Sequence, residues 1–163
     1  GASTIAAAAK GANVTHLDAS KTSVTWARKN LESSGLTDCS VRWIVDDAEK
    51  FLQREYRRNR KYDALIMDPP SFGRGPKGEV WNIETQMTTL LALCKNILSE
   101  SPKFILLTTH SPGISSLSLK NMLIKFLVSP NSGRFQTGDM SIYDTGSGLQ
   151  LPNGFYARFS ANP

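Results

Sequence analysis

The sequence lacks several features that define whole classes of protein. It has only two cysteines among 163 residues, Cys39 and Cys94, so it is not a disulfide-rich scaffold, and their separation does not match a metal-binding motif. No apolar run approaches the ~18 residues that a membrane-spanning helix needs. A hydrophobic content of 40% argues against a disordered chain. We therefore expect a globular protein without a membrane segment or a metal site, in a reducing intracellular compartment.

Acidic side chains are outnumbered. The chain has 19 Lys and Arg residues against 14 Asp and Glu residues, a net charge of +5 and a pI near 9.4. This mild excess permits a nucleic-acid partner without requiring one. A length of 163 residues suits one domain around one core, so we expect a single domain spanning residues 1–163. Its oligomeric state has no signature in the sequence.

The N-terminal end lacks an initiator methionine and any strand ahead of its first helix. The run from Ala6 to Ala9 predicts a helix that stops at Gly11, because alanine is the strongest helix former and glycine tolerates the left-handed conformation after a helix. We expect the sequence to be a piece of a longer polypeptide. A targeting peptide cannot be judged from such an end, so a cytoplasmic location is the simplest expectation and an organelle stays open.

The remainder alternates between strand-like and helix-like segments. Apolar strands are expected at 13–17, 41–45, 62–67 and 104–109, and helices after Ser20 and at 48–56, 83–98 and 119–127. Near-continuous apolar strands in βα repeats are typical of a parallel sheet covered on both faces. Turn signals at 145–148 and 152–154 predict an antiparallel hairpin at one edge of this α/β fold, with its best strand at 154–159.

Acidic residues follow three of the expected strands. Ligands of parallel sheets lie beyond the carboxyl ends of the strands, where Asp18, Asp46, Asp47 and Asp68 are expected. The Asp18 carboxylate suits the two hydroxyls of a ribose, or it interacts with the N-terminus of the next helix. Helix capping accounts for at least one of Asp46 and Asp47, and the other could accept a hydrogen bond from an adenine amino group.

The segment Asp68-Pro69-Pro70-Ser71-Phe72 is the most informative. An acid and two prolines after a strand predict a stiff, exposed loop, because proline cannot continue the ladder. Such a loop could present a side-chain oxygen and a backbone carbonyl to a planar amino group, with an aromatic neighbour for stacking. A rigid turn with no chemical role is the alternative.

Three segments together, 14–21, 42–48 and 68–81, resemble class I S-adenosylmethionine-dependent methyltransferases. The branch that they resemble contains the bacterial large-subunit ribosomal RNA cytosine methyltransferases. The resemblance implies a Rossmann-like sheet, S-adenosylmethionine as cofactor and RNA as the methyl acceptor. It assigns the cofactor to Gly1, Asp18, Ala19, Asp46, Asp47, Ala48 and Asp68, methyl transfer to Asp68, Pro69 and Pro70, and the acceptor to Ser71, Phe72, Arg74, Lys77 and His110.

The sequence departs from this family in two places. Gly1 resembles the last glycine of the cofactor loop, so we expect the family's first strand and most of that loop to be absent. No cysteine follows the strand at 104–109, although cytosine C5 methylation in this family uses one there. Cys94 falls on the apolar face of a helix, and nothing beside Cys39 would lower its pKa. We therefore expect direct methyl transfer, in which Asp68 orients the acceptor.

Several alternatives stay open. His110 is either a base or a hydrogen-bonded structural residue. The basic run from Arg54 to Lys61 is interpreted as a solvated helix end, where cations are favoured. The function could also be methylation of a small molecule or a protein, or that of an inactive fragment or binding module. A nicotinamide-dependent oxidoreductase ranks last, because it leaves Asp68-Pro69-Pro70 unexplained.

Overall fold

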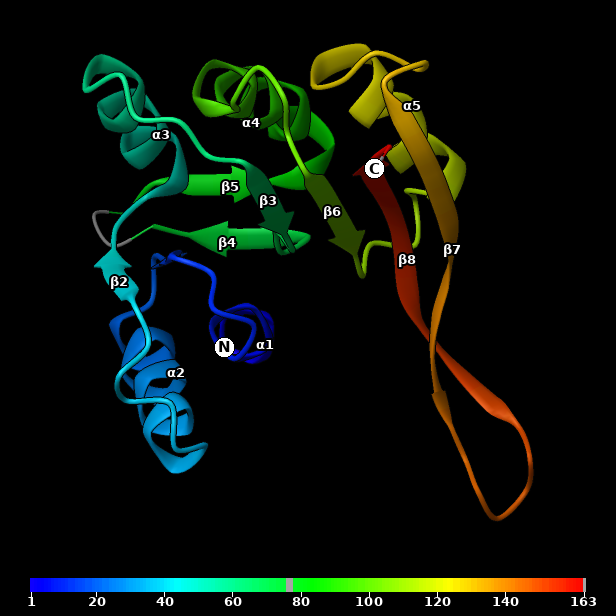
Figure 1. Cartoon of the computed structure of the whole chain (residues 1–163). Coiled ribbons are helices and arrows are strands. Elements are labelled where there is room, and N and C mark those ends of the chain that lie inside the picture. Colours follow the sequence, from blue (N-terminus) through cyan, green and yellow to red (C-terminus); the bar gives the residue numbers. More distant parts are fainter. Residues whose placement is uncertain (76–77, 163) are drawn as a thin grey trace. The chain divides into compact units, whose positions relative to one another are not determined.

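The computed structural model describes residues 1–75 and 78–162, which form two compact units (Figure 1). The first unit comprises Gly1–Phe51 with Arg74–Val80. The second comprises Leu52–Gly73 and the chain from Trp81 onward. Helix α3 (Ala48–Arg57) begins in the first unit and ends in the second.

The first unit contains α1 (Ala2–Ala8), β1 (Val14–Asp18), α2 (Lys21–Ser33) and β2 (Val41–Val45). The two strands pair in parallel, with Asp18 opposite Val45. The Ser20 hydroxyl caps α2 by accepting from the Ser23 amide at 3.2 Å. Gly11 and Gly35 follow the two helices with φ of 78° and 71°, which is the conformation that ends a helix.

Helices supply the apolar core of the first unit. Among the described residues of this unit, the buried hydrophobic ones all come from helical elements, namely Ala8, Val24, Ala27, Leu31 and Phe51. A hydrogen bond of 2.8 Å between Thr4 Oγ1 and His16 Nδ1 ties α1 to β1. Each residue of β1 is only partly buried, and among the described residues β1 pairs with β2 alone.

The second unit is built on a four-stranded sheet in the order β3-β6-β8-β7. Its strands are β3 (Ala64–Met67), β6 (Phe104–Thr109), β7 (Gly133–Tyr143) and β8 (Gln150–Ala161). Strands β3 and β6 are parallel, and β8 runs antiparallel to both of its neighbours. The β7–β8 hairpin extends well past the end of β6 as a twisted arm (Figure 1).

One face of this sheet carries the core of the second unit. Ile105, Leu107 and Thr109 alternate as fully buried residues of β6, beside Ala157 and Phe159 of β8. They are joined by the buried faces of α4 (Ile83–Ile97) and α5 (Ser116–Phe126), the face of α4 being Ile83, Met87, Leu90, Leu91, Cys94 and Ile97. The three- and four-residue spacing in α4 is the pattern of a helix with one buried face.

A short hairpin follows β3 where the sequence predicts only a loop. It consists of β4 (Phe72–Arg74) and β5 (Val80–Asn82). Asn82 then caps α4 by accepting from the Glu84 amide at 2.9 Å. Because β5 leads directly into α4, the segment after Asp68 is anchored at both ends.

The α/β fold with a mostly parallel sheet and an antiparallel edge is confirmed. The predicted turn at 152–154 is wrong, because these residues lie inside β8, where Gly154 has a φ of 113° beside a register shift of the ladder. The other predicted turn, at 145–148, does connect β7 to β8. No described helix is both long enough and apolar enough to span a bilayer.

Candidate active site

Asp68 lies at the carboxyl end of β3, next to the end of β6. The Thr108 hydroxyl, on β6, donates to Asp68 Oδ1 at 2.7 Å. His110 Nε2 lies 3.6 Å from the same oxygen. The Asp68 side chain is still 56% exposed, so Oδ2 remains accessible to a further donor. The hydrogen bond to Oδ1 therefore fixes the orientation of the carboxylate, while Oδ2 is accessible from solvent.

Two protein donors take up backbone carbonyls of the loop after Asp68. Trp81 Nε1 donates to the Pro70 carbonyl at 2.6 Å, and the Ile83 amide donates to the Ser71 carbonyl at 3.1 Å. No donor among the described residues reaches the carbonyl of Pro69. Of the loop carbonyls of Pro69, Pro70 and Ser71, that of Pro69 is therefore the candidate for the predicted hydrogen bond to a planar amino group.

The side chains of Ser71 and Phe72 differ in their surroundings. Ser71 Oγ accepts a 2.5 Å hydrogen bond from the Oγ of Ser111, a buried residue shortly after β6. Phe72 is 58% exposed, an unusual state for a large apolar ring. The exposed ring leaves one aromatic face accessible beside the loop, as stacking on a base would require.

In the first unit, Asp18 and Asp46 lie side by side at the carboxyl ends of the neighbouring strands β1 and β2. The Asp46 amide donates to the Asp18 carbonyl at 3.2 Å, so the two residues are neighbours across β1 and β2. Asp18 Oδ1 accepts from the Ser20 amide at 2.7 Å, and Asp47 Oδ1 caps α3 by accepting from the Lys50 amide at 3.0 Å. Capping is thus one role of Asp47, while Asp18 uses only its Oδ1 atom in the hydrogen bond to the Ser20 amide.

Gly1 contacts α2 closely. A Cβ atom built on Gly1 would lie 2.5 Å from the Ala27 side chain, which a real side chain cannot do. The third glycine of dinucleotide-binding loops serves this purpose, since it allows close packing at the start of the helix. Ala19 and Ala48 are both partly buried next to the strand ends, and Arg74 is exposed on the β4–β5 hairpin. Lys77 lies outside the described residues.

The two cysteines differ in their surroundings. Burial raises the pKa of the Cys94 thiol to about 12, and its sulfur lies 3.7 Å from the Met67 sulfur. Cys39 Sγ lies 3.5 Å from the Ala8 carbonyl, within the first unit. A thiol with a raised pKa is almost entirely protonated at neutral pH, so Cys94 cannot supply a thiolate.

Sequence reasoning did not assign Thr108, Ser111 or Gly154 to the site. A Cβ atom at Gly154 would lie 2.3 Å from the Thr109 carbonyl and 3.2 Å from His110 Nδ1, so only glycine lets β8 pass this close to the end of β6. A strand end with hydroxyl residues is the signal that was available for Thr108 and Ser111.

Across the described ranges, the structure has no group of three or more residues arranged to hold a metal ion.

This arrangement defines a class of protein: the chain has the fold of class I S-adenosylmethionine-dependent methyltransferases. A crystal structure of the S-adenosylmethionine-dependent methyltransferase from Agrobacterium tumefaciens superposes with a TM-score of 0.90 and is 36% identical. The match covers 99% of this chain and 53% of that protein. The resemblance to this class is confirmed.

More particularly, the chain resembles large-subunit ribosomal RNA methyltransferases. It is 35% identical over 78 residues to ribosomal RNA large subunit methyltransferase K of Neisseria meningitidis, covering 47% of this chain and 22% of that protein. It is 30% identical over 112 residues to methyltransferase I of Aeromonas salmonicida, covering 68% of this chain and 27% of that protein. The chain thus spans about a quarter of the length of these curated relatives. No family model matches it.

Proposed function

We propose that this chain is the methyl-transferring part of an S-adenosylmethionine-dependent enzyme that acts on RNA of the ribosomal kind. The observation that carries the proposal is the Asp68 carboxylate, fixed by Thr108 yet 56% exposed, at the start of a stiff loop. The likeness to ribosomal RNA methyltransferases and the net charge of +5 support an RNA acceptor. Both units would belong to one partial domain over residues 1–163, inside the cell where RNA is found.

The residues of the first unit fit the polar parts of the cofactor. Asp18 and Asp46 bring carboxylate oxygens to one strand end, and carboxylates are paired acceptors for ribose hydroxyls and amino groups. Ala19 and Ala48 are small residues beside them, and Gly1 allows α1 to begin close to α2. When bound, S-adenosylmethionine supplies an electrophilic methyl group on a sulfonium.

In the proposed mechanism the protein aligns the acceptor instead of bonding to it. Asp68 Oδ2 and the Pro69 carbonyl accept hydrogen bonds from the group to be methylated and fix the direction of its lone pair. Pro70 stiffens this segment, Ser71 holds it to Ser111, and Phe72 provides a stacking face. Arg74 and Lys77 contact phosphate beside the acceptor. His110, 3.6 Å from Asp68, receives the proton that leaves the acceptor.

One finding favours a mechanism without a cysteine nucleophile. Cys94 is 4% exposed, and burial raises the pKa of its thiol. The C39S/C94A double variant should therefore transfer methyl groups to RNA as fast as the parent chain. Transfer would be measured with radiolabelled S-adenosylmethionine and ribosomal RNA, and loss of transfer in a folded double variant would rule out the direct mechanism.

The same assay separates the competing functions. Methyl transfer that requires added RNA supports the proposal, and transfer to small molecules or protein without RNA contradicts the RNA assignment. Calorimetric titration with S-adenosylhomocysteine tests the inactive-fragment alternative. Binding by this chain argues for a working cofactor site, and no binding would favour an inactive fragment or binding module.

A further inference from the structure

We propose that the end of α3 and the facing side of α4 form a second RNA contact, in which a base enters a small cavity and arginines hold the neighbouring phosphates. This inference rests on the proposed function, because it takes RNA as the partner. It concerns a surface at the opposite end of β3 from Asp68. Gln53, Tyr56, Arg57 and Arg60 contribute from the segment around α3, and Leu93 and Asn96 contribute from α4.

The cavity has the size of one ring system. It measures about 220 Å³, below the ~300–1,000 Å³ typical of sites for complete small ligands. Leu52 and Leu93 provide its apolar lining, and Gln53 and Asn96 bring two side-chain amides to its rim. An amide offers both a donor and an acceptor, which is the chemistry needed to meet the edge of a nucleobase.

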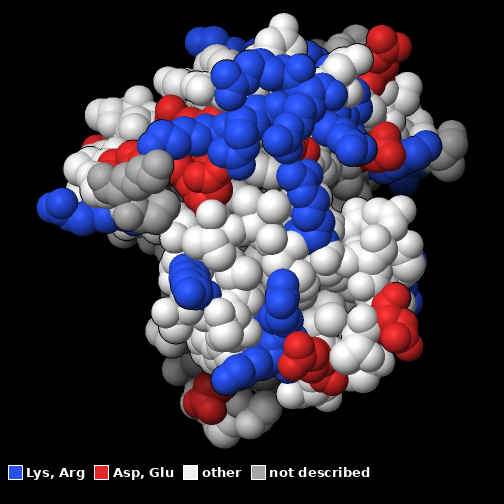
Figure 2. Space-filling view, turned by 90° about the vertical axis from the view of Figure 1, so that its left-hand side faces the viewer, with Lys and Arg blue, Asp and Glu red and all other residues white. Residues whose placement is uncertain are grey.

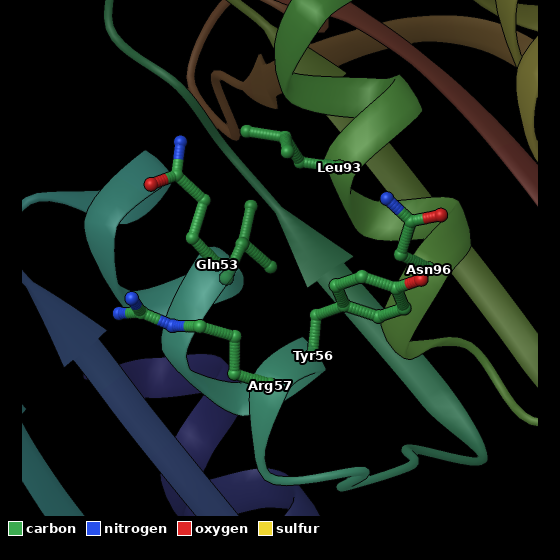
Figure 3. Close-up of a pocket in the computed structure, with 6 residues that line it drawn as sticks. Gln53, Tyr56, Arg57, Leu93 and Asn96 are labelled. Carbon is green, nitrogen blue, oxygen red and sulfur yellow. The ribbon is translucent and has the colours of Figure 1, made fainter.

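Tyr56 is the aromatic member of this surface. Figure 3 shows its ring projecting from α3 toward Asn96 of α4, while the Arg57 guanidinium points away from α4. Tyr56 is 57% exposed, so a ring face is accessible to a partner. Bases of single-stranded nucleic acid stack on such rings whatever their sequence.

The charge around the cavity is strongly positive. The segment from Leu52 to Tyr62 has a single acid, Glu55, which is fully buried and accepts from the Tyr62 hydroxyl at 2.7 Å. Its five basic residues are Arg54, Arg57, Arg58, Arg60 and Lys61. Figure 2 shows a dense field of Lys and Arg side chains at the level of α3. A helix end alone accounts for one or two cations, not for five.

Two of these cations are available to a ligand. Arg54 also interacts within the protein. Arg58 lies 3.6 Å from Glu55, and Lys61 donates to the Asn96 carbonyl at 2.8 Å. Arg57 and Arg60 are exposed, and within the described part of the chain their side chains form no ion pair. A polyanion is the partner that complements unpaired arginines next to an aromatic cavity.

The position of the surface determines its role. Strand β3, which is 4 residues long, separates Tyr62 from Asp68 by roughly 13 Å at ~3.3 Å per residue. An RNA segment bound at α3 therefore cannot be the nucleotide that is methylated. The contact would hold a flanking part of the RNA and thereby raise affinity without changing the rate of transfer from bound RNA.

The test measures binding of a fluorescent single-stranded RNA to the whole chain at several salt concentrations. The R57Q/R60Q variant removes two charges and keeps the side chains long, and K125Q/R134Q, from α5 and β7, is the charge-matched control. We expect R57Q/R60Q to reduce the salt slope by ~1.4, since each phosphate contact with a single strand contributes ~0.7. Tyr56→Ala should weaken binding roughly 5- to 150-fold, and Tyr56→Phe, which keeps the ring, should not.

Several results would overturn the proposal. One is equal loss of affinity in R57Q/R60Q and the control, and another is unchanged binding by Tyr56→Ala. A third is binding of phosphatidylglycerol vesicles that depends on Arg57 and Arg60 while RNA binding does not. In each case RNA methylation could persist, so the proposed function would stand. Absence of any RNA binding or methylation by the parent chain would instead remove the proposed function itself.

Discussion

The two units differ in how completely their strands are covered. No residue of β1 or β2 is buried, and Val45 is 44% exposed. In the second unit, Ile105 and Leu107 of β6 have no exposed surface, and neither has Ala157 of β8. A two-stranded sheet is only marginally stable by itself, whereas a central strand that pairs on both sides and is covered by helices is stable. The acids that we propose to bind the cofactor, Asp18 and Asp46, thus follow strands that are less buried than those of the second unit.

The largest expected effect separates the proposed roles of the units. Asp68→Asn should lower the rate of methyl transfer at least ~100-fold, as loss of one oriented polar group does, and this effect should exceed any change in S-adenosylhomocysteine affinity. Asp18→Asn should instead weaken that affinity roughly 10- to 150-fold, the loss of a charged hydrogen bond. Kinetics and calorimetry measure the two effects.

Asp63→Asn is the matched control for the first prediction, because Asp63 is an exposed acid just before the opposite end of β3. It should affect neither quantity. If Asp68→Asn and Asp63→Asn behaved alike, the role assigned to Asp68 would be lost.

The next prediction concerns the difference in burial. Leu107→Ala removes a fully buried side chain and should lower the free energy of unfolding by about 2–5 kcal/mol. Leu17→Ala in β1 removes a partly buried one and should cost about half as much, because less apolar area is lost. Urea denaturation measures both, and a larger cost for Leu17→Ala would contradict the comparison.

A smaller effect is expected at Gly154. Gly154 has a φ of 113°, and a Cβ atom built there would lie 2.3 Å from the Thr109 carbonyl. Gly154→Ala should therefore lower the free energy of unfolding by about 1–3 kcal/mol. Gly113→Ala is the control, since its nearest neighbour is Glu84 at 3.8 Å and its φ is not positive. Equal thermal stability of the two variants would show that β8 does not need glycine here.

The smallest expected effect is a pH dependence in the first unit. Burial is the main cause that lowers the pKa of His16 below its ordinary value of about 6.5. The folded state therefore favours the neutral ring, so its stability is fully present above pH 6.5 and falls as the pH drops below it. His16→Gln should flatten this part of the pH profile, and an unchanged profile would argue against the assignment.

The secondary structure was largely predictable because its signals are local. The spacing of apolar residues identified α4, Ser20 identified the start of α2, and Gly11 and Gly35 identified two helix ends. The turn predicted at 152–154 was wrong for the same reason. Pro, Asn and Gly are turn residues in a short window, but here β8 accommodates them through the register shift beside Gly154.

The candidate site was only partly predictable. Asp68 and its loop could be recognised from consecutive residues, whereas the hydroxyl that orients Asp68 belongs to Thr108, forty positions further on. The cavity between α3 and α4 had no signal at all, because helix periodicity does not say which helices are neighbours. The basic residues from Arg54 to Lys61 were visible in the sequence, but their position next to Asn96 was not.

The sequence by itself determined the order of most strands and helices, the acids at the strand ends and the burial of Cys94, since each depends on residue type and short spacing. Only the tertiary structure decided that β6 pairs with β3 and brings Thr108 and His110 to Asp68. It alone also gave β8 its place between β6 and β7, and Tyr56 its place beside α4. The physical reason is that strand order and helix packing are set by burial summed over the whole chain, which no local segment contains.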